Sequence, residues 1–260
     1  MWGFYKSVEV EKVHLNFCKN ILGVGKKTSN NMVYFELGRL PLTVKMKLRI
    51  FKYWIKLKTT ENCILKTCYE NLVARNDRWI LQIKSELSSL GLSYIWSENY
   101  IDFNVFSIIK QRLLDVHKQH VLENIIRSPK GYLYQHLIDN ICLQTYLRKP
   151  IDRKYLRLLA KFRLSNHPLN IEIGRHRNIV KSERTCKCCH LHDIEDEFHF
   201  ILKCPLYNNL REIFLKKYYY DKPSVSKLIE LLSTSNVSDL LKVGKFLSAA
   251  VSLRKSKMDI

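Results

Sequence analysis

Three cysteines and one histidine within a short segment have the types and spacing of metal ligands. Residues 184–205 contain Cys186, Cys189, His199 and Cys204 in the arrangement C-x2-C-x9-H-x4-C. Two cysteines separated by two residues can direct both sulfurs to one side of a tight turn, and the other two ligands can complete a tetrahedron. A Cys3His set leaves no coordination position for a catalytic water. The segment therefore predicts a structural Zn²⁺ site.

Neighbouring residues leave the exact ligand set open. Cys188 lies beside Cys189, and His190 and His192 follow, so one of these three could replace a predicted ligand. Four of the eight cysteines fall within nineteen residues. The alternative is that these are reduced core residues, but apolar packing does not require such clustering.

Acidic residues are concentrated in the same segment. The run from Asp193 to Glu197 suits the N-terminus of a short helix, and Pro205 is expected to end that helix directly after Cys204. Elsewhere the chain has no adjacent Asp-Asp pair of the kind that holds catalytic metal ions, and eight glycines leave little room for phosphate-binding loops. The sequence thus predicts a protein that is not an enzyme on its own, with a diffuse active site as the weaker alternative.

The charge balance points to a polyanionic partner. Lysine and arginine number 44 against 24 acidic residues, which gives a net charge of +20 and a pI near 9.6. Such an excess favours binding to the backbone of RNA or DNA. An anionic membrane surface would attract the same charge, but nucleic acid is the favoured partner and no membrane partner is predicted. No small-molecule substrate is indicated, and the sequence does not identify a protein partner.

The first basic segment, residues 39–58, carries seven basic residues and no acidic one. Alternation around residues 44–50 suggests a strand, but the unbroken length favours a helix. On a helix, the positions that share a basic face and would contact phosphates are Lys45, Arg49, Lys52 and Lys56. Tyr53 and Trp54 could stack with bases, although a core position is favoured for Trp54.

The second basic segment precedes the cysteines. Residues 148–184 contain eleven basic and three acidic residues, a net of +8. Asp152 is expected to cap a helix there. Five further residues are candidates for nucleic-acid contact, namely Arg153, Arg157 and Lys161 on one face of that helix, and Arg175 and Arg177 before the cysteines.

The predicted fold is mainly α: a helical bundle followed by a small Cys3His zinc segment and C-terminal helices. Hydrophobic residues make up 46% of the chain, whereas glycine and proline are scarce. Two domains are expected, 1–150 and 151–260. Helices are predicted over 8–22, after 28 to 38, over 62–90 with a break at Asp77, over 106–127, 131–149, 153–164, 224–233 and 237–253, with a strand or extended arm at 170–174.

The chain has no apolar stretch of about eighteen residues, so no membrane span is expected. Its N-terminus lacks the features of a signal peptide. An intracellular protein, nuclear or cytoplasmic, with cysteines as thiols or metal ligands is therefore predicted.

Two blocks of the sequence resemble parts of a known family. Residues 22–42, LGVGKKTSNNMVYFELGRLPL, with the basic segment ending RIFKYWIKL, are similar to the region after the reverse transcriptase domain of animal non-LTR (LINE-like) retrotransposons. Residues 184–211 resemble the reverse transcriptase zinc-binding region of those polyproteins. The family pattern R-x-C-x2-C, E-x-H and Cys-Pro is met here by Arg184, Cys186, Cys189, Glu197, His199, Cys204 and Pro205.

The resemblance implies a fragment or decayed copy of such an element, because the polymerase motif Tyr-x-Asp-Asp of the family is absent from this chain. It also implies that the four ligands hold zinc while flanking arginines and lysines hold element RNA or target DNA during target-primed reverse transcription. The alternative function is a zinc-stabilised helical scaffold for protein interaction, with the charge serving solubility. Neither the preference between RNA and DNA nor the oligomeric state follows from the sequence.

Overall fold

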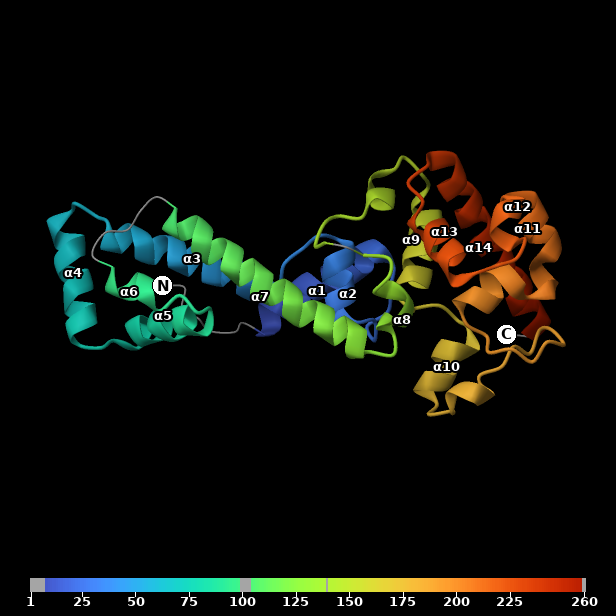
Figure 1. The fold of residues 1–260 in the computed structure, drawn as a ribbon, viewed down its shortest axis with the longest axis horizontal. Helices are drawn as coiled ribbons and strands as arrows, with labels where there is room; N and C mark the ends of the chain where they lie inside the picture. The colour runs from blue at the N-terminus through green and yellow to red at the C-terminus, as the bar shows by residue number, and fades with distance from the viewer. Residues whose placement is uncertain (1–7, 99–103, 139, 259–260) are drawn as a thin grey trace. The chain divides into compact units, whose positions relative to one another are not determined.

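The computed structural model describes residues 8–98, 104–138 and 140–258, and within these ranges the chain is helical with no sheet (Figure 1). Strand pairing there is limited to isolated bridges, Leu37 with Leu143 and Thr185 with Ile194. The predicted mainly α fold is confirmed. The helices are α1 (Val8–Leu22), α2 (Asn30–Glu36), α3 (Leu42–Lys58), α4 (Cys63–Ala74), α5 (Arg78–Ser89), α6 (Tyr94–Ser97), α7 (Val105–Arg127), α8 (Gly131–Tyr134), η1 (Thr145–Arg148), α9 (Arg153–Arg163), α10 (Asn170–His176), η2 (Lys181–Glu183), η3 (His199–Lys203), η4 (Pro205–Tyr207), α11 (Asn208–Phe214), α12 (Lys217–Tyr220), α13 (Val225–Ser233) and α14 (Val237–Met258).

The chain forms two compact units. Among the described residues, the first unit contains 8–14 and 40–123, and the second contains 15–39 and 124–258. Within the second unit an ion pair between Glu36 and Arg163 joins α2 to α9. Independent folding of 1–150 and 151–260 stays a prediction.

The first unit is built around one apolar core. Buried side chains of α3, α5, α6 and α7 form it. Trp54 is fully buried, its ring stacks on that of Trp96 with centroids 5.7 Å apart, and its indole nitrogen donates to the hydroxyl of Tyr69 at 3.1 Å. The core position favoured for Trp54 is confirmed. The helical interpretation of the first basic segment is confirmed as well, since α3 runs unbroken from Leu42 to Lys58.

Three helices begin after a residue whose side chain caps them, and Asp152 is the cap predicted above. The side chains of Asp77 and Asp152 accept hydrogen bonds from the backbone nitrogens of Trp79 and Lys154, at 2.8 and 2.9 Å. Ser224 caps α13 in the same way. Each cap satisfies a backbone donor that the first helical turn leaves unpaired.

The second unit packs α9 and α11 against α14. Aromatic rings fill the space beside these helices, with centroids 5.4 Å apart for Phe162 and Phe200 and 4.6 Å apart for Phe200 and Tyr207. Phe200 belongs to the cysteine-rich segment and is buried. The segment that carries the predicted ligands is therefore anchored in this core.

A glycine permits the close approach of α9 and α14. A Cβ atom added at Gly244 would lie 2.5 Å from the Cβ of Tyr155. We expect Gly244→Ala to lower the free energy of unfolding by about 1–3 kcal/mol, the usual effect of overpacking. Urea denaturation measures it. Stabilisation by about 1 kcal/mol, as helix propensity alone predicts, would contradict the close packing.

The prediction of a helix over 131–149 is wrong for most of its length. The structure has one helical turn, α8, and the 3₁₀ turn η1, and residue 139 lies outside the described ranges. Tyr134 and Tyr146 explain the difference, because both hydroxyls donate to the buried carboxylate of Glu36, at 2.9 and 2.7 Å. The two tyrosines are twelve residues apart, and a single helix would separate them by about 18 Å.

The strand or extended arm expected at 170–174 is also wrong, because these residues begin α10. The backbone nitrogen of Asn170 donates to the carboxylate of Glu195 at 2.8 Å, and that of Ile171 donates to the Glu195 carbonyl at 3.1 Å. A remote acid thus satisfies the start of this helix, where the local sequence offers no cap.

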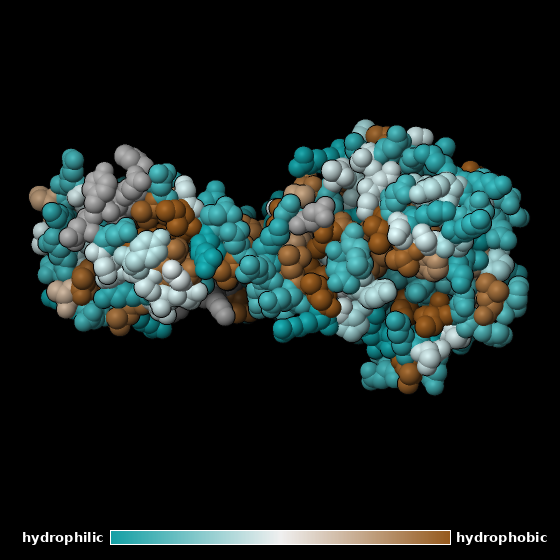
Figure 2. Space-filling model, in the orientation of Figure 1, coloured by the Kyte–Doolittle hydropathy of each residue, from teal (hydrophilic) through white to brown (hydrophobic). Residues whose placement is uncertain are grey.

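None of the described helices combines the length and the apolar character needed to cross a membrane. In Figure 2, hydrophilic residues cover most of the visible face of each unit, and hydrophobic residues form separate patches among the hydrophilic ones.

Candidate metal centre

Strand-like pairing brings the first two predicted ligands into a turn. The backbone nitrogen of Cys186 donates to the carbonyl of Asp193 at 2.8 Å, and that of Glu195 donates to the carbonyl of Arg184 at 2.9 Å. These bonds fold residues 186–193 into a closed loop. The turn at its start is tightened by a bond from the Cys188 nitrogen to the Cys186 sulfur at 3.4 Å.

The other two ligands occupy the ends of one wide helical turn. Residues His199–Lys203 form a π-helix, in which the nitrogen of Cys204 donates to the carbonyl of His199 at 2.7 Å. This hydrogen bond joins residues five positions apart and closes one π-helical turn. The four residues between His199 and Cys204 therefore place both side chains on the same side of that turn. Asp196 supports the start of the turn by accepting from the His199 nitrogen at 2.8 Å. The expected end of the helix at Cys204 and Pro205 is confirmed.

The four side chains meet in space. One potential ligand atom from each of Cys186, Cys189, His199 and Cys204 lies within 4.8 Å of every other. The sulfurs of Cys186 and Cys204 are 4.0 Å apart, and the sulfur of Cys189 is 3.4 Å from Nε2 of His199. Sulfur ligands at about 2.3 Å from a tetrahedral zinc lie about 3.8 Å from one another. The cluster is buried and its geometry fits a tetrahedral metal ion.

Without a bound cation, the electrostatics of the cluster favour a single thiolate, at Cys186. Hydrogen bonds from Cys204 and then His199 lower the pKa of Cys186 to about 3, although burial acts against this. The same contact with Cys186, together with burial, raises the pKa of Cys204, and burial raises that of Cys189. A divalent cation at the centre would stabilise all three thiolates, because metal binding releases their protons.

A second layer of contacts orients the ligands. Nδ1 of His199, on the far side of the ring from Cys189, lies 3.5 Å from the carboxylate of Asp193. Lys203 holds the same carboxylate at 3.0 Å. A carboxylate behind a histidine is the usual support for a ligating imidazole. The sequence interpretation assigned Asp193 to the start of a helix and missed this role, which the loop closure at Cys186 creates.

The alternative ligands lie at or beside the cluster. Cys188 forms a separate three-membered group with Cys186 and Glu195. Both carboxylate oxygens of Glu195 already accept from Arg254, at 2.6 and 2.7 Å, and burial raises the pKa of Cys188 to about 11. His190 and His192 are exposed and belong to neither group. The geometry therefore favours the original four, and the assignment of the ligands stays a prediction.

The E-x-H pair of the segment points in two directions. Glu197 faces away from the cluster, and its carboxylate lies 2.7 Å from Nε2 of the buried His167. Burial acts to raise the pKa of Glu197, but His167 holds it below its ordinary value. This pair joins the cysteine-rich segment to the loop after α9, and nothing in the local sequence pattern identified His167 as its partner.

The basic residues predicted to contact nucleic acid are distributed over both units. Four of them, Lys45, Arg49, Lys52 and Lys56, are exposed on α3 of the first unit. In the second unit Arg153 and Arg177 are exposed and Lys161 is half-buried. Two others are engaged within the protein: Arg157 donates to the carbonyls of Asn20 and Ile21, and Arg175 pairs with Glu172. Their contact with nucleic acid stays a prediction.

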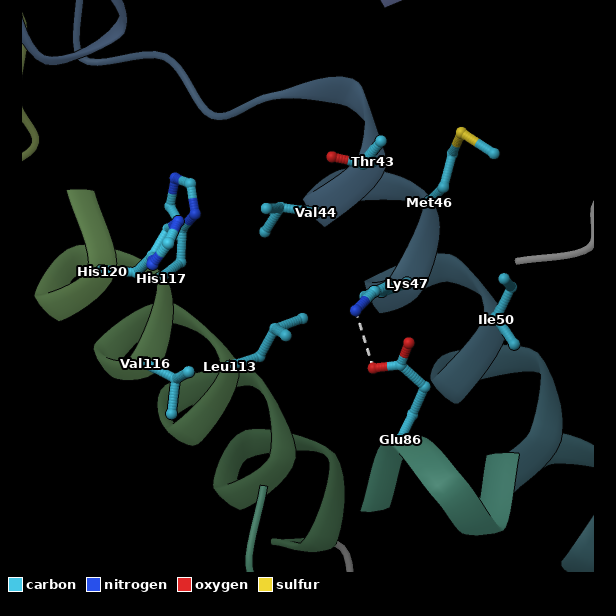
Figure 3. A pocket seen from close by; sticks show the side chains of 10 residues that line it. All are labelled: Thr43, Val44, Met46, Lys47, Ile50, Glu86, Leu113, Val116, His117 and His120. Carbon is cyan, nitrogen blue, oxygen red and sulfur yellow. Dashed lines mark hydrogen bonds and ion pairs between the residues drawn. The ribbon is translucent and has the colours of Figure 1, made fainter. Parts of the chain in front are cut away.

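The first unit also has a pocket of about 410 Å³ lined mainly by apolar side chains of α3 and α7 (Figure 3). Lys47 and Glu86 form an ion pair at 2.7 Å inside it. His117 and His120 lie side by side at one end. Burial and then His120 lower the pKa of His117, and neither histidine joins a group of three potential metal ligands among the described residues. The charges of this pocket cancel, which does not favour a polyanion.

Comparison with known proteins adds no assignment: no family model matches the sequence, and no curated protein or solved structure matches it. The functional argument therefore rests on the buried Cys3His cluster, which could hold a metal ion, and on the distribution of charge.

Proposed function

We propose that this chain is a zinc-stabilised module that binds the phosphate backbone of RNA or DNA and is not catalytic on its own. The observation that carries the proposal is the face of α3 with Lys45, Arg49, Lys52 and Lys56 all exposed. The helix contains no acidic residue. None of the four cations forms an ion pair with another described residue, so they are available to an external anion.

The Cys3His cluster supports a structural role for the metal. Three thiolates and one imidazole fill the four positions of a tetrahedral zinc and leave none for water or substrate. The cluster is buried beside the core of the second unit, where Phe200 and Tyr207 pack. Zinc would hold the cysteine-rich segment folded, and the exposed arginines of this unit, Arg153 and Arg177, would add weaker backbone contacts.

The order of the two blocks along the chain supports a more specific origin. A basic segment that resembles the region after a reverse transcriptase domain precedes a segment that resembles the zinc-binding region of non-LTR retrotransposon polyproteins. We infer that the module derives from such a polyprotein and holds element RNA or target DNA, while polymerisation belongs to parts of the polyprotein that this chain does not contain.

Salt dependence tests the proposal. We expect binding to an RNA or DNA oligonucleotide to weaken linearly on a plot of log affinity against log salt concentration, as counterion release requires. Replacing all four α3 cations by glutamine should reduce the slope by up to about 3 units, because each phosphate contact contributes roughly 0.7–0.9. Fluorescence anisotropy with labelled oligonucleotides at several salt concentrations measures both slopes.

A matched variant controls for the change in net charge. Glutamine at Lys242, Lys245, Lys255 and Lys257, all exposed on α14, removes the same four charges from another helix. An equal loss of slope in both variants would show that only total charge matters. Affinity that is flat with salt in the unaltered protein would overturn the proposal and leave the interaction scaffold, which then requires a stoichiometric protein partner.

A further inference from the structure

The basic face of α3 also lines a pocket with aromatic walls. The pocket has a volume of about 590 Å³ and is lined by Arg49, Lys52, Lys56, Tyr53, Ile55 and Phe106, with Thr59 at its edge. Its size falls in the range of small-molecule sites, about 300–1,000 Å³. None of the described residues that line it is acidic. In contrast to the pocket that holds Lys47 and Glu86, this one has uncompensated positive charge.

Helical spacing places an aromatic ring among the cations. Residues 49, 52, 53 and 56 follow one another at intervals that share a face of a helix, so Tyr53 lies between Arg49 and Lys56. The three cations span about 10 Å of helix. Phe106, at the start of α7, comes to the same pocket from more than fifty residues away in the sequence, which is why the sequence pattern of α3 did not reveal it.

The ring of Tyr53 is partly held and partly open. It packs against Trp79 of α5 with centroids 6.2 Å apart, yet 43% of the residue is exposed. An aromatic ring held on one side and open on the other is a stacking surface of low entropic cost. Cations around it would attract a ligand that has both negative charge and a flat apolar face.

We propose that this pocket holds one unpaired base of a single-stranded nucleic acid, stacked on Tyr53 beside Phe106, with Arg49, Lys52 and Lys56 on the adjoining phosphates. A nucleotide combines an apolar face with negative charge on either side of it along the strand. Bases in a duplex are stacked and paired, so their faces are not accessible without extrusion. Single strands, whether RNA or DNA, present the required chemistry directly. The proposal rests on the proposed function and adds the strand state to it.

The test compares the full-length, zinc-containing protein with Tyr53→Ala, Tyr53→Phe and Tyr94→Ala. Tyr94 is an exposed tyrosine of the same unit outside this pocket and serves as the control. The probes are a twelve-nucleotide single-stranded RNA, a DNA of the same sequence, and the corresponding duplex DNA. Tyr53→Ala should weaken single-strand binding about ten-fold or more, the loss typical of one stacked base, without changing the salt slope. Tyr53→Phe and Tyr94→Ala should stay within about two-fold of the unaltered protein, and duplex binding should not change.

A second measurement avoids dependence on the folding of the variants. A single-stranded oligonucleotide containing 5-iodouridine, irradiated in complex with the unaltered protein, should cross-link to a peptide containing Tyr53 or Phe106. Single-strand binding that is unaffected by Tyr53→Ala, or equal losses on single strand and duplex, would overturn the stacking pocket and leave backbone binding intact. An unaltered protein without salt-dependent binding to any of the three probes would remove the proposed function and this inference together. The ratio of the affinities for the single-stranded RNA and the single-stranded DNA shows which of the two nucleic acids the pocket prefers.

Discussion

A chain with Cys204 replaced by alanine is expected to contain no zinc, whereas the unaltered protein purified under reducing conditions contains one zinc ion per chain. Cys204 is fully buried, and its sulfur lies 4.0 Å from that of Cys186. Its loss leaves three ligands and opens the centre to water. Structural zinc contributes roughly 10–16 kcal/mol of binding free energy, comparable with the whole stability of a domain. We therefore expect the cysteine-rich segment of Cys204→Ala to unfold at ordinary temperature.

Elemental analysis measures the zinc, and thermal unfolding followed by circular dichroism measures the structural loss. Cys188→Ala is the matched control, because Cys188 lies between two predicted ligands in the sequence and shares the loop. It should keep its zinc. Loss of zinc from Cys188→Ala together with its retention in Cys189→Ala would show that Cys188 is a ligand instead. A well-folded unaltered protein without zinc would overturn the metal centre.

The clustering of Cys186, Cys189, His199 and Cys204 could be predicted from the sequence because its geometry is local. Cys186 and Cys189 share one turn, and His199 and Cys204 close one π-helical turn, so spacing alone brings each pair together. The same holds for the capped helices, where Asp77 and Asp152 act on residues two positions away. Short-range rules of this kind need no knowledge of the tertiary structure.

The features that could not be predicted depend on partners distant in the sequence. Residues 131–149 have a helical pattern, but tertiary bonds from two of their tyrosines to Glu36 override it. The start of α10 depends in the same way on Glu195, a residue twenty-five positions away. Propensity is a weak guide where a buried charge elsewhere must be satisfied, because an unpaired buried carboxylate costs more than a helical turn gains.

The buried carboxylate of Glu36 is the basis of a second prediction with a large expected loss of stability. The carboxylate of Glu36 has no exposed surface and accepts from Nε of Arg163 at 2.6 Å. Although burial opposes the charged form of Arg163, Glu36 and the nearby tyrosines raise its pKa above the ordinary value. Burial and then Glu36 raise the pKa values of Tyr134 and Tyr146, so both hydroxyls stay protonated and donate. The carboxylate of Glu36, on α2, thus accepts hydrogen bonds from three side chains, Tyr134 of α8, Tyr146 of η1 and Arg163 of α9.

Glu36→Leu should lower the free energy of unfolding of the second unit by about 3–5 kcal/mol, because it leaves the Arg163 guanidinium buried without a countercharge. The double variant Glu36→Leu with Arg163→Met should recover part of this loss, since removing both charges removes the desolvation penalty. Lys216→Ala breaks the exposed pair between Lys216 and Asp239 and should cost only about 0–1 kcal/mol.

The placement of the tryptophans allows the two units to be followed separately in urea. The described tryptophans, Trp54, Trp79 and Trp96, all belong to the first unit, so their fluorescence reports that unit, while far-ultraviolet circular dichroism reports both. With zinc present in excess, Glu36→Leu should shift the dichroism transition and leave the tryptophan transition in place. If Glu36→Leu alone is as stable as Lys216→Ala, the buried ion pair does not hold α2 and α9 together. If Glu36→Leu shifts the dichroism and the tryptophan transitions equally, the two units unfold as one.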